Sequence, residues 1–451
     1  MKHSEKPRPG GPVTNTRTII ITLLLLLVGL TAGCLQDPFH VWDRVLGKSK
    51  SGASYFSKQS KHCADIPPIS ASEFDGRQRD LANALHATNA SAYIAEPGAS
   101  ALYFTNVTTT QWKLTERPLL LIISPEVNAG SVLPKLTILA PQFEKSRASI
   151  LPIPFDNIQF ILWPEEQDPY QVLVDSIDLP EGSIYIDSAT RFFIVDGLQK
   201  AYEKGQVLTA PPEVTKLRER KSSHEIDIMR CANEANLLTI RQVHKQLYIG
   251  IRESEAQSMI ASALTEMGLE NGACITLFGE DAALPHGGGT DKQLGVSDFA
   301  LFDCTASLHG YWSDVTRTVA LPDSQIPSDH QEIWKHVRSA QGAALAQAHE
   351  GVVAKSVDAA ARKALAEFQL DGFLTHRLGH GIGLENHEAP YLNGGSEAVL
   401  TPGNCFSDEP GVYIEGEIGV RLEDCFCIDE SGQPVLLTKG VGGQTSSPWS
   451  P

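Results

Sequence analysis

The stretch 375–424 restricts the fold of this chain more than any other. It combines three histidines and several carboxylates with many glycines, in the segments THRLGHGIGLENHEAP and DEPGVYIEGEIGVRLED. Glycines let backbones approach one another closely, and carboxylates and imidazoles are ligands of hard or borderline divalent metals. The stretch therefore predicts a metal site at a point where several backbone segments meet.

A second set of candidate ligands lies in the segment LFDCTASLHGYWSDVTRT. Asp303 ends an apolar run and Asp314 lies at the start of the next, with Gly310 in the turn between them. A hairpin would bring the two carboxylates together, and carboxylates held close repel one another, which favours bound cations or shared protons. For this pair alone, the interpretation that each aspartate caps a turn is equally open.

Glu409 and Glu423 repeat this arrangement. The turn Pro410-Gly411 directly follows Glu409, and Glu423 lies on the next strand-like run. Isolated glutamates are usually solvated, but these two lie among apolar residues and glycines. Four buried acids would be costly without counter-charge, and two divalent ions would supply it.

Several histidines accompany these acids. His380 stands between two glycines, His376 and His387 bracket it at spacings of four and seven, and His286 lies in the glycine-rich segment ALPHGGGTD. A lone histidine is more often structural than a ligand, but three within twelve positions beside glycines favour a site. A ligand set rich in oxygen with one imidazole fits manganese, cobalt or iron better than a thiolate zinc site.

Taken together, these segments resemble the pita-bread metallopeptidases of the aminopeptidase P and prolidase type. They are the aspartate pair with GYWSDVTRT, the GHGIGLENHE segment, the EPGVY segment and the GVRLED segment. The resemblance covers residues 73–439. It implies an α/β (α+β) chain with a pita-bread catalytic domain, whose curved sheet holds the metals, behind a smaller α/β amino-terminal domain. It also implies two divalent ions, usually Mn2+ with Co2+, Fe2+ or Zn2+ as alternatives, a homodimer, and cleavage of the peptide bond that precedes proline.

The resemblance further implies a role for each site residue. A hydroxide that bridges the two ions would attack the scissile carbonyl, and Glu409 would pass the proton to the leaving proline nitrogen. His286, His376 and His387 would contact the substrate or stabilise the tetrahedral intermediate, and Arg421 would lie beside the metal-binding glutamate. The implied metal ligands are Asp303, Asp314, His380, Glu409 and Glu423.

Two questions of function stay open at this point. An Xaa-Pro dipeptidase must capture the free carboxylate of its substrate, whereas an Xaa-Pro aminopeptidase leaves that side open; the loop between Glu409 and Glu423 and the segment ALPHGGGTDK favour the dipeptidase slightly. The alternative from a different class is a catalytically silent binding protein on the same fold. Loss of a ligand position would favour that alternative, and no ligand position is lost.

Length and composition limit the number of domains and the class of partner. The chain has 451 residues, of which 42% are hydrophobic, enough to bury at least two cores. The formal net charge of −17 argues against a nucleic-acid partner. The eight cysteines form no CxxC pair, so no zinc ribbon or redox motif is expected, and we interpret Cys425 and Cys427 as small buried residues. The predicted divisions are a leader (1–35), a linker (36–72), an amino-terminal α/β domain (73–210), the pita-bread domain (211–440) and a flexible tail (441–451).

Periodicity predicts the main elements, because helices repeat their apolar positions every 3.6 residues and strands every two. We expect a long helix over 217–247 that Ser223 caps. The other expected helices are 74–88, 254–267, 329–349 and 356–368. The expected strands are 91–94, 119–123, 136–140, 184–186, 300–303, 316–321, 404–408 and 419–423.

The leader suggests a location. Residues 19–35 are apolar, and as a helix they would span roughly 26 Å, near the lower limit for crossing a bilayer. We therefore expect a signal peptide or an uncleaved signal anchor, with a secreted or membrane-anchored catalytic part that is luminal or extracellular. Sequons at Asn89 and Asn106 would then make it a glycoprotein. Processing of Cys34 as a bacterial lipoprotein is the alternative.

Overall fold

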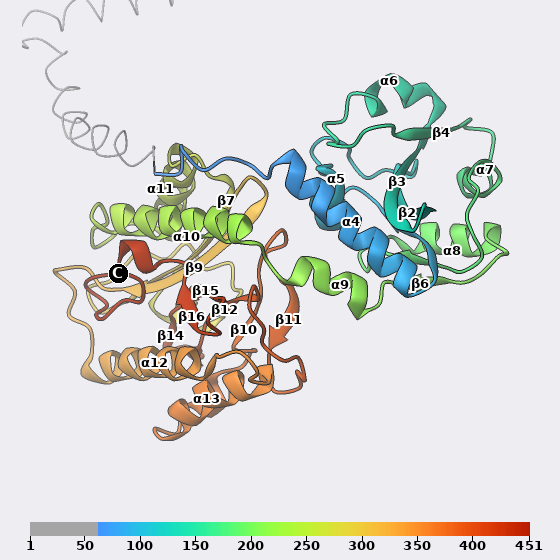
Figure 1. Ribbon diagram of the computed structural model, residues 1–451. Helices are drawn as coiled ribbons and strands as arrows, with labels where there is room; N and C mark the ends of the chain where they lie inside the picture. Colours follow the sequence, from blue (N-terminus) through green and yellow to red (C-terminus); the bar gives the residue numbers. More distant parts are fainter. Residues whose placement is uncertain (1–61) are drawn as a thin grey trace, which may run out of the picture. The chain divides into compact units, whose positions relative to one another are not determined.

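The computed structural model describes residues 62–451 (Figure 1). The predicted leader and the linker up to residue 61 lie outside the described residues, so the structure does not test them. The described residues form one compact unit. The domain boundary expected near residue 210 therefore stays a prediction.

The first half of this unit is built on a six-stranded sheet with the order β4-β3-β2-β1-β5-β6. β1 pairs parallel with β5 and antiparallel with β2, and every residue of β1 is buried. Helix α4 packs on β2 and β3, and the Ser70 side chain caps it by accepting a hydrogen bond from the Glu73 amide. The strands are β1 (Ala90–Ala95), β2 (Leu120–Asn128), β3 (Ser131–Pro141), β4 (Gln159–Trp163), β5 (Ser183–Ile186) and β6 (Val207–Thr209). The helices are α4 (Ala71–Ala87), α5 (Ala99–Thr105), α6 (Lys145–Ala148), α7 (Pro169–Ser176), α8 (Phe192–Ala201) and α9 (Pro212–Glu219).

The second half carries three smaller sheets with the orders β7-β8-β9, β11-β10-β12-β15-β16 and β13-β14. Helices α10 and α11 contact β7, β8 and β9, whereas α12 and α13 contact strands from β11 to β14, so the strands lie between two helical layers (Figure 1). The strands are β7 (Glu270–Phe278), β8 (Ala300–Leu308), β9 (Tyr311–Val319), β10 (Gly379–Gly381), β11 (Glu388–Leu392), β12 (Cys405–Asp408), β13 (Gly411–Ile414), β14 (Ile418–Arg421), β15 (Asp424–Ile428) and β16 (Pro434–Leu436). The helices are α10 (Ser223–His244), α11 (Glu253–Glu266), α12 (Ser328–Gln347) and α13 (Ala354–Ala366), with the short turn η2 (Gly279–Ala283) after β7.

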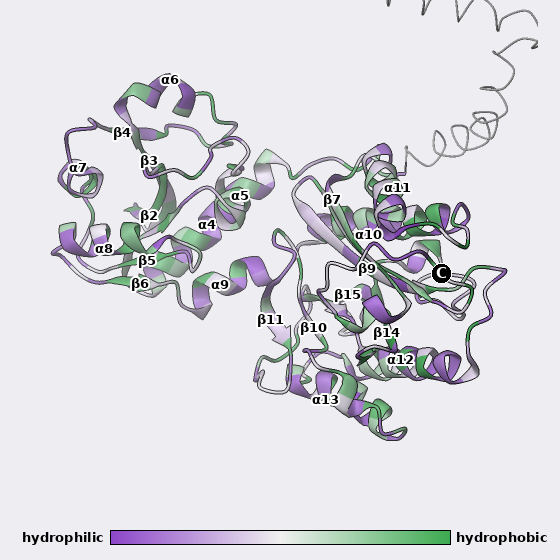
Figure 2. Cartoon of the chain, turned by 180° about the vertical axis from the view of Figure 1, so that it is seen from behind, coloured by the Kyte–Doolittle hydropathy of each residue, from purple (hydrophilic) through white to green (hydrophobic). Residues whose placement is uncertain are grey.

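The core of this half lies between α12, α13 and the strands from β12 to β15. Hydrophilic and hydrophobic residues alternate along α12, as expected of a helix with one buried face (Figure 2). Trp334 on that face is 2% exposed, and its indole N–H donates to the Thr318 carbonyl at 2.8 Å. Each fully buried aromatic or large aliphatic side chain contributes about 1.5–3 kcal/mol to folding, so this layer holds the strands of the site rigidly in place.

The helix expected over 217–247 is broken in two. α9 ends at Glu219 and α10 begins at Ser223. Ser222, not the predicted Ser223, is the cap of α10: it forms a capping box with Glu225. Between the helices, the Lys221 amide donates to the Gly403 carbonyl at 2.8 Å, a contact with a distant segment that helical periodicity does not reveal.

The β8-β9 hairpin forms around the expected turn. His309 and Gly310 have φ values of 51° and 85°, a left-handed conformation that glycine adopts without strain. The register pairs Asp303 with Thr316 and Thr305 with Asp314. Because side chains two residues apart in a strand share a face, Asp303 and Asp314 lie diagonally on one face of the hairpin.

Six of the cysteines form disulfides. Cys274 pairs with Cys304 across β7 and β8, and Cys405 pairs with Cys427 across β12 and β15. The third disulfide joins Cys63 and Cys231. The interpretation of Cys427 as a simple buried residue is therefore wrong, because the strand register places it opposite another cysteine. Cys425 is free and buried, as expected.

The predicted secretory or membrane location needs correction. Among residues 62–451, no helix is long and apolar enough to cross a membrane. Residues 19–35, on which the prediction of a signal anchor depended, lie outside the described residues. Of the two sequons expected to make a glycoprotein, Asn106 uses its side-chain amide to donate to the Pro152 carbonyl at 3.0 Å.

Candidate metal centre

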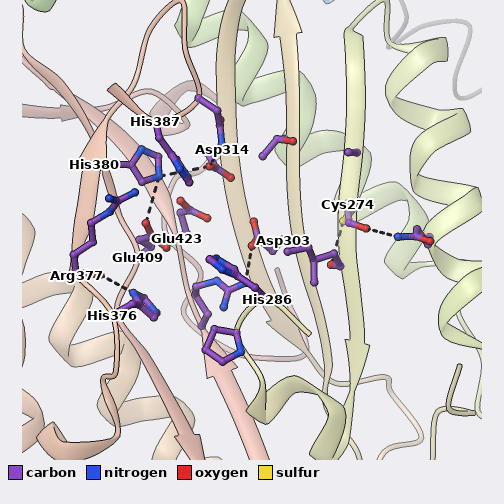
Figure 3. A pocket seen from close by; sticks show the side chains of 17 residues that line it. Cys274, His286, Asp303, Asp314, His376, Arg377, His380, His387, Glu409 and Glu423 are labelled. Atoms are coloured by element: carbon purple, nitrogen blue, oxygen red, sulfur yellow. Dashed lines mark hydrogen bonds and ion pairs between the residues drawn. The ribbon is translucent and has the colours of Figure 1, made fainter. Parts of the chain in front are cut away.

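A pocket of about 680 Å³ opens between the β7-β8-β9 sheet and the strands from β10 to β15. Figure 3 shows acidic side chains and imidazoles converging on it from both sides. All the predicted site residues line this pocket, although they are spread over more than 130 positions of the sequence. They are His286, Asp303, Asp314, His376, His380, His387, Glu409, Arg421 and Glu423.

The carboxylates form two adjacent groups. Ligand atoms of Asp303, Asp314 and Glu423 lie within 4.8 Å of one another, and so do ligand atoms of His380, Glu409 and Glu423. Glu423 belongs to both groups. Its backbone amide donates to the Thr316 carbonyl at 3.1 Å, which ties the segment after β14 to β9 and so brings the two groups together.

The buried acids are incompletely satisfied by the protein. Asp314 Oδ1 and Glu423 Oε1 are buried and have no hydrogen-bond partner. Burial, and then repulsion from the neighbouring carboxylates, raises the pKa of Asp314 and of Glu423 well above the usual range. Burial also raises the pKa of Glu409 to about 8, although the Arg421 charge opposes this. Oxygen atoms aimed into a shared space without donors fit divalent cations.

His380 presents a free lone pair to the same space. Its Nδ1 lies 3.1 Å from the Gly381 carbonyl, which can only accept, so Nδ1 carries the proton and Nε2 is bare. Nε2 lies 3.3 Å from Glu409 Oε1 and 3.8 Å from Asp314 Oδ2. Burial lowers the pKa of His380 to about 3, so the imidazole is neutral, as a metal ligand must be.

The glycine before His380 is required by close packing. A Cβ at Gly379 would lie 2.0 Å from the Ser407 carbonyl oxygen. Any side chain there would push β10 away from β12, and His380 with it. The backbone amide of His380 also donates to Ser407 Oγ at 3.0 Å, which fixes the position of the imidazole.

A chain of hydrogen bonds runs from Asp303 to His376. Arg421 donates to Asp303 Oδ2 at 2.6 Å and to the Tyr413 hydroxyl at 2.8 Å. His376 Nδ1 donates to the Arg377 carbonyl, so its bare Nε2 accepts from the Tyr413 hydroxyl at 2.8 Å. Burial lowers the pKa of His376 to about 4. Tyr413 therefore couples the imidazole of His376 to the orientation of Asp303.

Sequence reasoning missed several residues that line the pocket or contact its acids. Asn386 donates to Asp314 Oδ2 at 3.0 Å, and Thr316 donates to Glu423 Oε2 at 2.7 Å. Arg377 and Gln257 also line the pocket. Thr316 could have been found, because it stands two residues after Asp314 on the same strand face. Arg377 and Asn386 lie inside the stretch 375–424, where the histidines, carboxylates and glycines are the stronger signal.

Comparison with known proteins identifies the family. Residues 227–430 match metallopeptidase family M24. An uncharacterized peptidase of Schizosaccharomyces pombe is 40% identical over 390 residues, which cover 85% of this chain and 84% of that protein. The chain belongs to metallopeptidase family M24. The predicted resemblance and the prediction of a metallopeptidase are confirmed.

Other relatives of this M24 chain carry more specific names. A Xaa-Pro dipeptidase of Pyrococcus horikoshii is 32% identical over 257 residues, covering 56% of this chain and 72% of that protein. The crystal structure of dipeptidase PepE from Mycobacterium ulcerans is similar with a TM-score of 0.72 and 28% identity, over 82% of this chain and 97% of that one. The predicted α/β pita-bread fold is confirmed by such neighbours. The names of these relatives give no support to the predicted secretory or membrane-anchored location, which is wrong on these findings.

Proposed function

We propose that this M24 chain hydrolyses the peptide bond that precedes proline and depends on two divalent metal ions. The observation that carries the proposal is the pair of adjacent ligand groups that share Glu423. A single ion would leave one of the two groups without counter-charge. The relatives named Xaa-Pro dipeptidase, and the similar structures described as prolidases, support proline as the residue after the scissile bond.

The proposed ligands divide between the two ions. Asp303 and Asp314 would hold one ion, and His380 and Glu409 would hold the other, while Glu423 and Asp314 would contribute to both. Asp314 would fit such a shared role because it also belongs to a third group with His380 and His387. An oxygen-rich set with one imidazole favours manganese, with cobalt, iron or zinc as alternatives. When bound, the ions would supply an activated water as nucleophile and a positive field for the charge that develops on the scissile carbonyl.

The protein's own groups would move the proton and orient the substrate. Glu409 is only partly buried, and burial raises its pKa to about 8, so it would carry the proton from the attacking water to the leaving proline nitrogen. His387 and His286 would donate N–H groups to the scissile carbonyl oxygen. Burial and the Arg377 charge lower the pKa of His387, so it is a neutral donor near pH 7.

Further assignments are proposals of the same kind. We propose a division into an amino-terminal domain of residues 73–210 and a pita-bread domain of residues 211–440, and a homodimer as the assembly. The six-stranded sheet with its own core clusters supports the first of these domains.

The test is hydrolysis of matched peptides by the manganese-loaded chain. We expect cleavage of Xaa-Pro or Xaa-Pro-Yaa, no cleavage of the Xaa-Ala controls, and loss of activity with a chelator. Elemental analysis of the same preparation should give two ions per chain. Two bound ions without turnover of any proline peptide would contradict the proposal and favour a binding protein on this fold.

A further inference from the structure

The pocket contains a second arginine, Arg377, to which the proposed reaction assigns no role. Arg377 is half-buried, lines the pocket, and stands directly after His376. Figure 3 shows its side chain extending from beside His376 toward His380, along the wall of the pocket. Its charge lowers the pKa of Glu409 and of His387, which agrees with a guanidinium close to the reacting groups.

Arg377 differs from Arg421 in its partners. Arg421 is 2% exposed and its guanidinium is held by Asp303, Tyr413 and Thr316. Within residues 62–451, the Arg377 guanidinium has neither a carboxylate partner nor a hydrogen bond. Its contact is the ring of Tyr391, with Cζ 4.7 Å from the ring centroid. Stacking on an aromatic face holds the plane of a guanidinium while its N–H groups stay available.

Among residues 62–451, most other sheltered arginines pair with an acid, and Arg241 and Arg338, which do not, donate to backbone carbonyls instead. Arg377 has neither kind of partner in this part of the chain. Arg77, Arg218, Arg317 and Arg362 each form an ion pair with an aspartate or a glutamate. A guanidinium that is preorganised by stacking and lacks an acid presents a fork of donors whose geometry matches a carboxylate.

The charge of the pocket points the same way. Its acids are Asp303, Asp314, Glu409 and Glu423, whose charges two divalent ions would balance. Two positive charges of the pocket then remain: Arg421 contacts Asp303, whereas Arg377, on the pocket wall, contacts no acid among the described residues. A substrate carboxylate would neutralise the charge of Arg377, whereas an uncharged peptide continuation would leave it without a partner.

We propose that Arg377 binds a carboxylate of the peptide substrate and thereby makes this chain select Xaa-Pro dipeptides with a free carboxyl end. This inference rests on the proposed cleavage before proline. A carboxylate could also come from the side chain of an acidic residue before proline, and the two sources are separable by experiment. In either case Arg377 determines specificity, while the ions and the histidines act on the scissile bond.

The experiment compares Ala-Pro with Ala-Pro-amide, and Glu-Pro with Gln-Pro, on the manganese-loaded full chain and on the Arg377→Gln and Arg377→Lys variants. Loss of a charge-assisted hydrogen bond should lower kcat/KM for Ala-Pro by roughly tenfold to a hundredfold in Arg377→Gln. The rate for Ala-Pro-amide should not change, and Arg377→Lys should recover part of the preference. Arg147→Gln is the matched control, because Arg147 also stacks on an aromatic ring, Trp112 at 4.1 Å, but does not line the pocket.

The outcomes are distinct. A selective loss for Ala-Pro over its amide supports recognition of the carboxyl end, and a selective loss for Glu-Pro over Gln-Pro supports recognition of an acidic side chain. An equal effect of Arg377→Gln on all four peptides, or no effect, overturns the inference and leaves the proposed function standing. Silence of the metal-loaded wild type on every proline peptide defeats the proposed function and the inference together. Calorimetry with proline and prolinamide gives a binding readout: wild type should prefer proline, and Arg377→Gln should not.

Discussion

The charges of buried acids are compensated in opposite ways at two sites of this chain. Between α4, β9 and α10, Glu225 is 2% exposed, and both of its oxygens are satisfied: Oε1 accepts from the Tyr311 hydroxyl at 2.8 Å and Oε2 from the Ser222 amide at 2.9 Å. Arg77 lies 3.4 Å from Oε1. At the metal pocket, Asp314 and Glu423 are buried as deeply, yet each keeps one oxygen without a donor.

The difference teaches where the protein leaves room for a cation. Burial raises the pKa of both Glu225 and Glu423, but Arg77 is the main group that opposes the shift at Glu225, whereas repulsion from three other carboxylates adds to it at Glu423. An acid with a complete protein shell stabilises a contact between elements. An acid cluster without one needs charge from outside the chain.

The largest effect should follow from neutralising the pocket acids. Asp314→Asn and Glu423→Gln keep the shape of the side chains but remove one ligand charge each. We expect loss of bound metal and a fall in turnover by about a thousandfold or more, because in the proposed reaction the ions would supply the nucleophile. Elemental analysis and peptide hydrolysis measure the two effects. Glu225→Gln is the control, and the chain with this substitution should bind metal as the wild type does. Full metal content in Asp314→Asn would contradict the inference that the pocket acids need a cation.

The second prediction concerns the site where Arg77 faces the buried acid Glu225. Arg77 donates to Glu73, Tyr311 and the Tyr103 carbonyl besides facing Glu225. Arg77→Met would leave Glu225 buried without its positive partner, which should lower the free energy of unfolding by about 3–5 kcal/mol. Denaturant unfolding measures the loss, and metal content at native conditions should not change. A loss of metal equal to that in Asp314→Asn would mean that the two sites are not independent.

A third prediction tests the hydrogen bonds that orient the pocket. Tyr413→Phe removes the hydroxyl that joins Arg421 to His376 and leaves His376 Nε2 without a donor. Partners of this kind contribute about ten- to a hundredfold to activity, so kcat should fall by that range while metal content stays at two ions. Stopped-time assays with saturating substrate measure kcat. An effect on KM alone would assign Tyr413 to substrate binding.

The sequence revealed the acids of the pocket because their local signals are strong. Asp303 and Asp314 lie on the two strands that flank the turn at Gly310, and the register of β8 and β9 then fixes their shared face. Local sequence patterns do not reveal contacts between distant segments. The break before α10 depends on the Lys221 amide and Gly403, and the disulfide of Cys427 depends on which strand lies opposite. Arg377 was missed because only the folded pocket reveals that it has no acid partner.

The last and smallest prediction uses pH to distinguish the two kinds of buried acid. With the pKa of Glu409 raised to about 8 in the metal-free chain, the pocket holds a proton below that pH, and a bound ion must displace it. Metal affinity should therefore weaken about tenfold for each unit of pH below 8 for each proton released. The sign for stability is opposite: a carboxyl with a raised folded-state pKa favours the folded metal-free chain at low pH, and this contribution is lost as the pH rises toward 8.

Calorimetric titration of manganese in two buffers with different ionisation enthalpies gives the number of protons released, and thermal unfolding gives the stability. We expect the metal-free chain to become less stable between pH 6 and 8, and the metal-loaded chain to show a weaker slope. Glu409→Gln should remove one released proton, whereas Glu225→Gln should leave proton release unchanged. Proton release that is zero at pH 6.5 would contradict the idea that the pocket acids share protons until ions replace them.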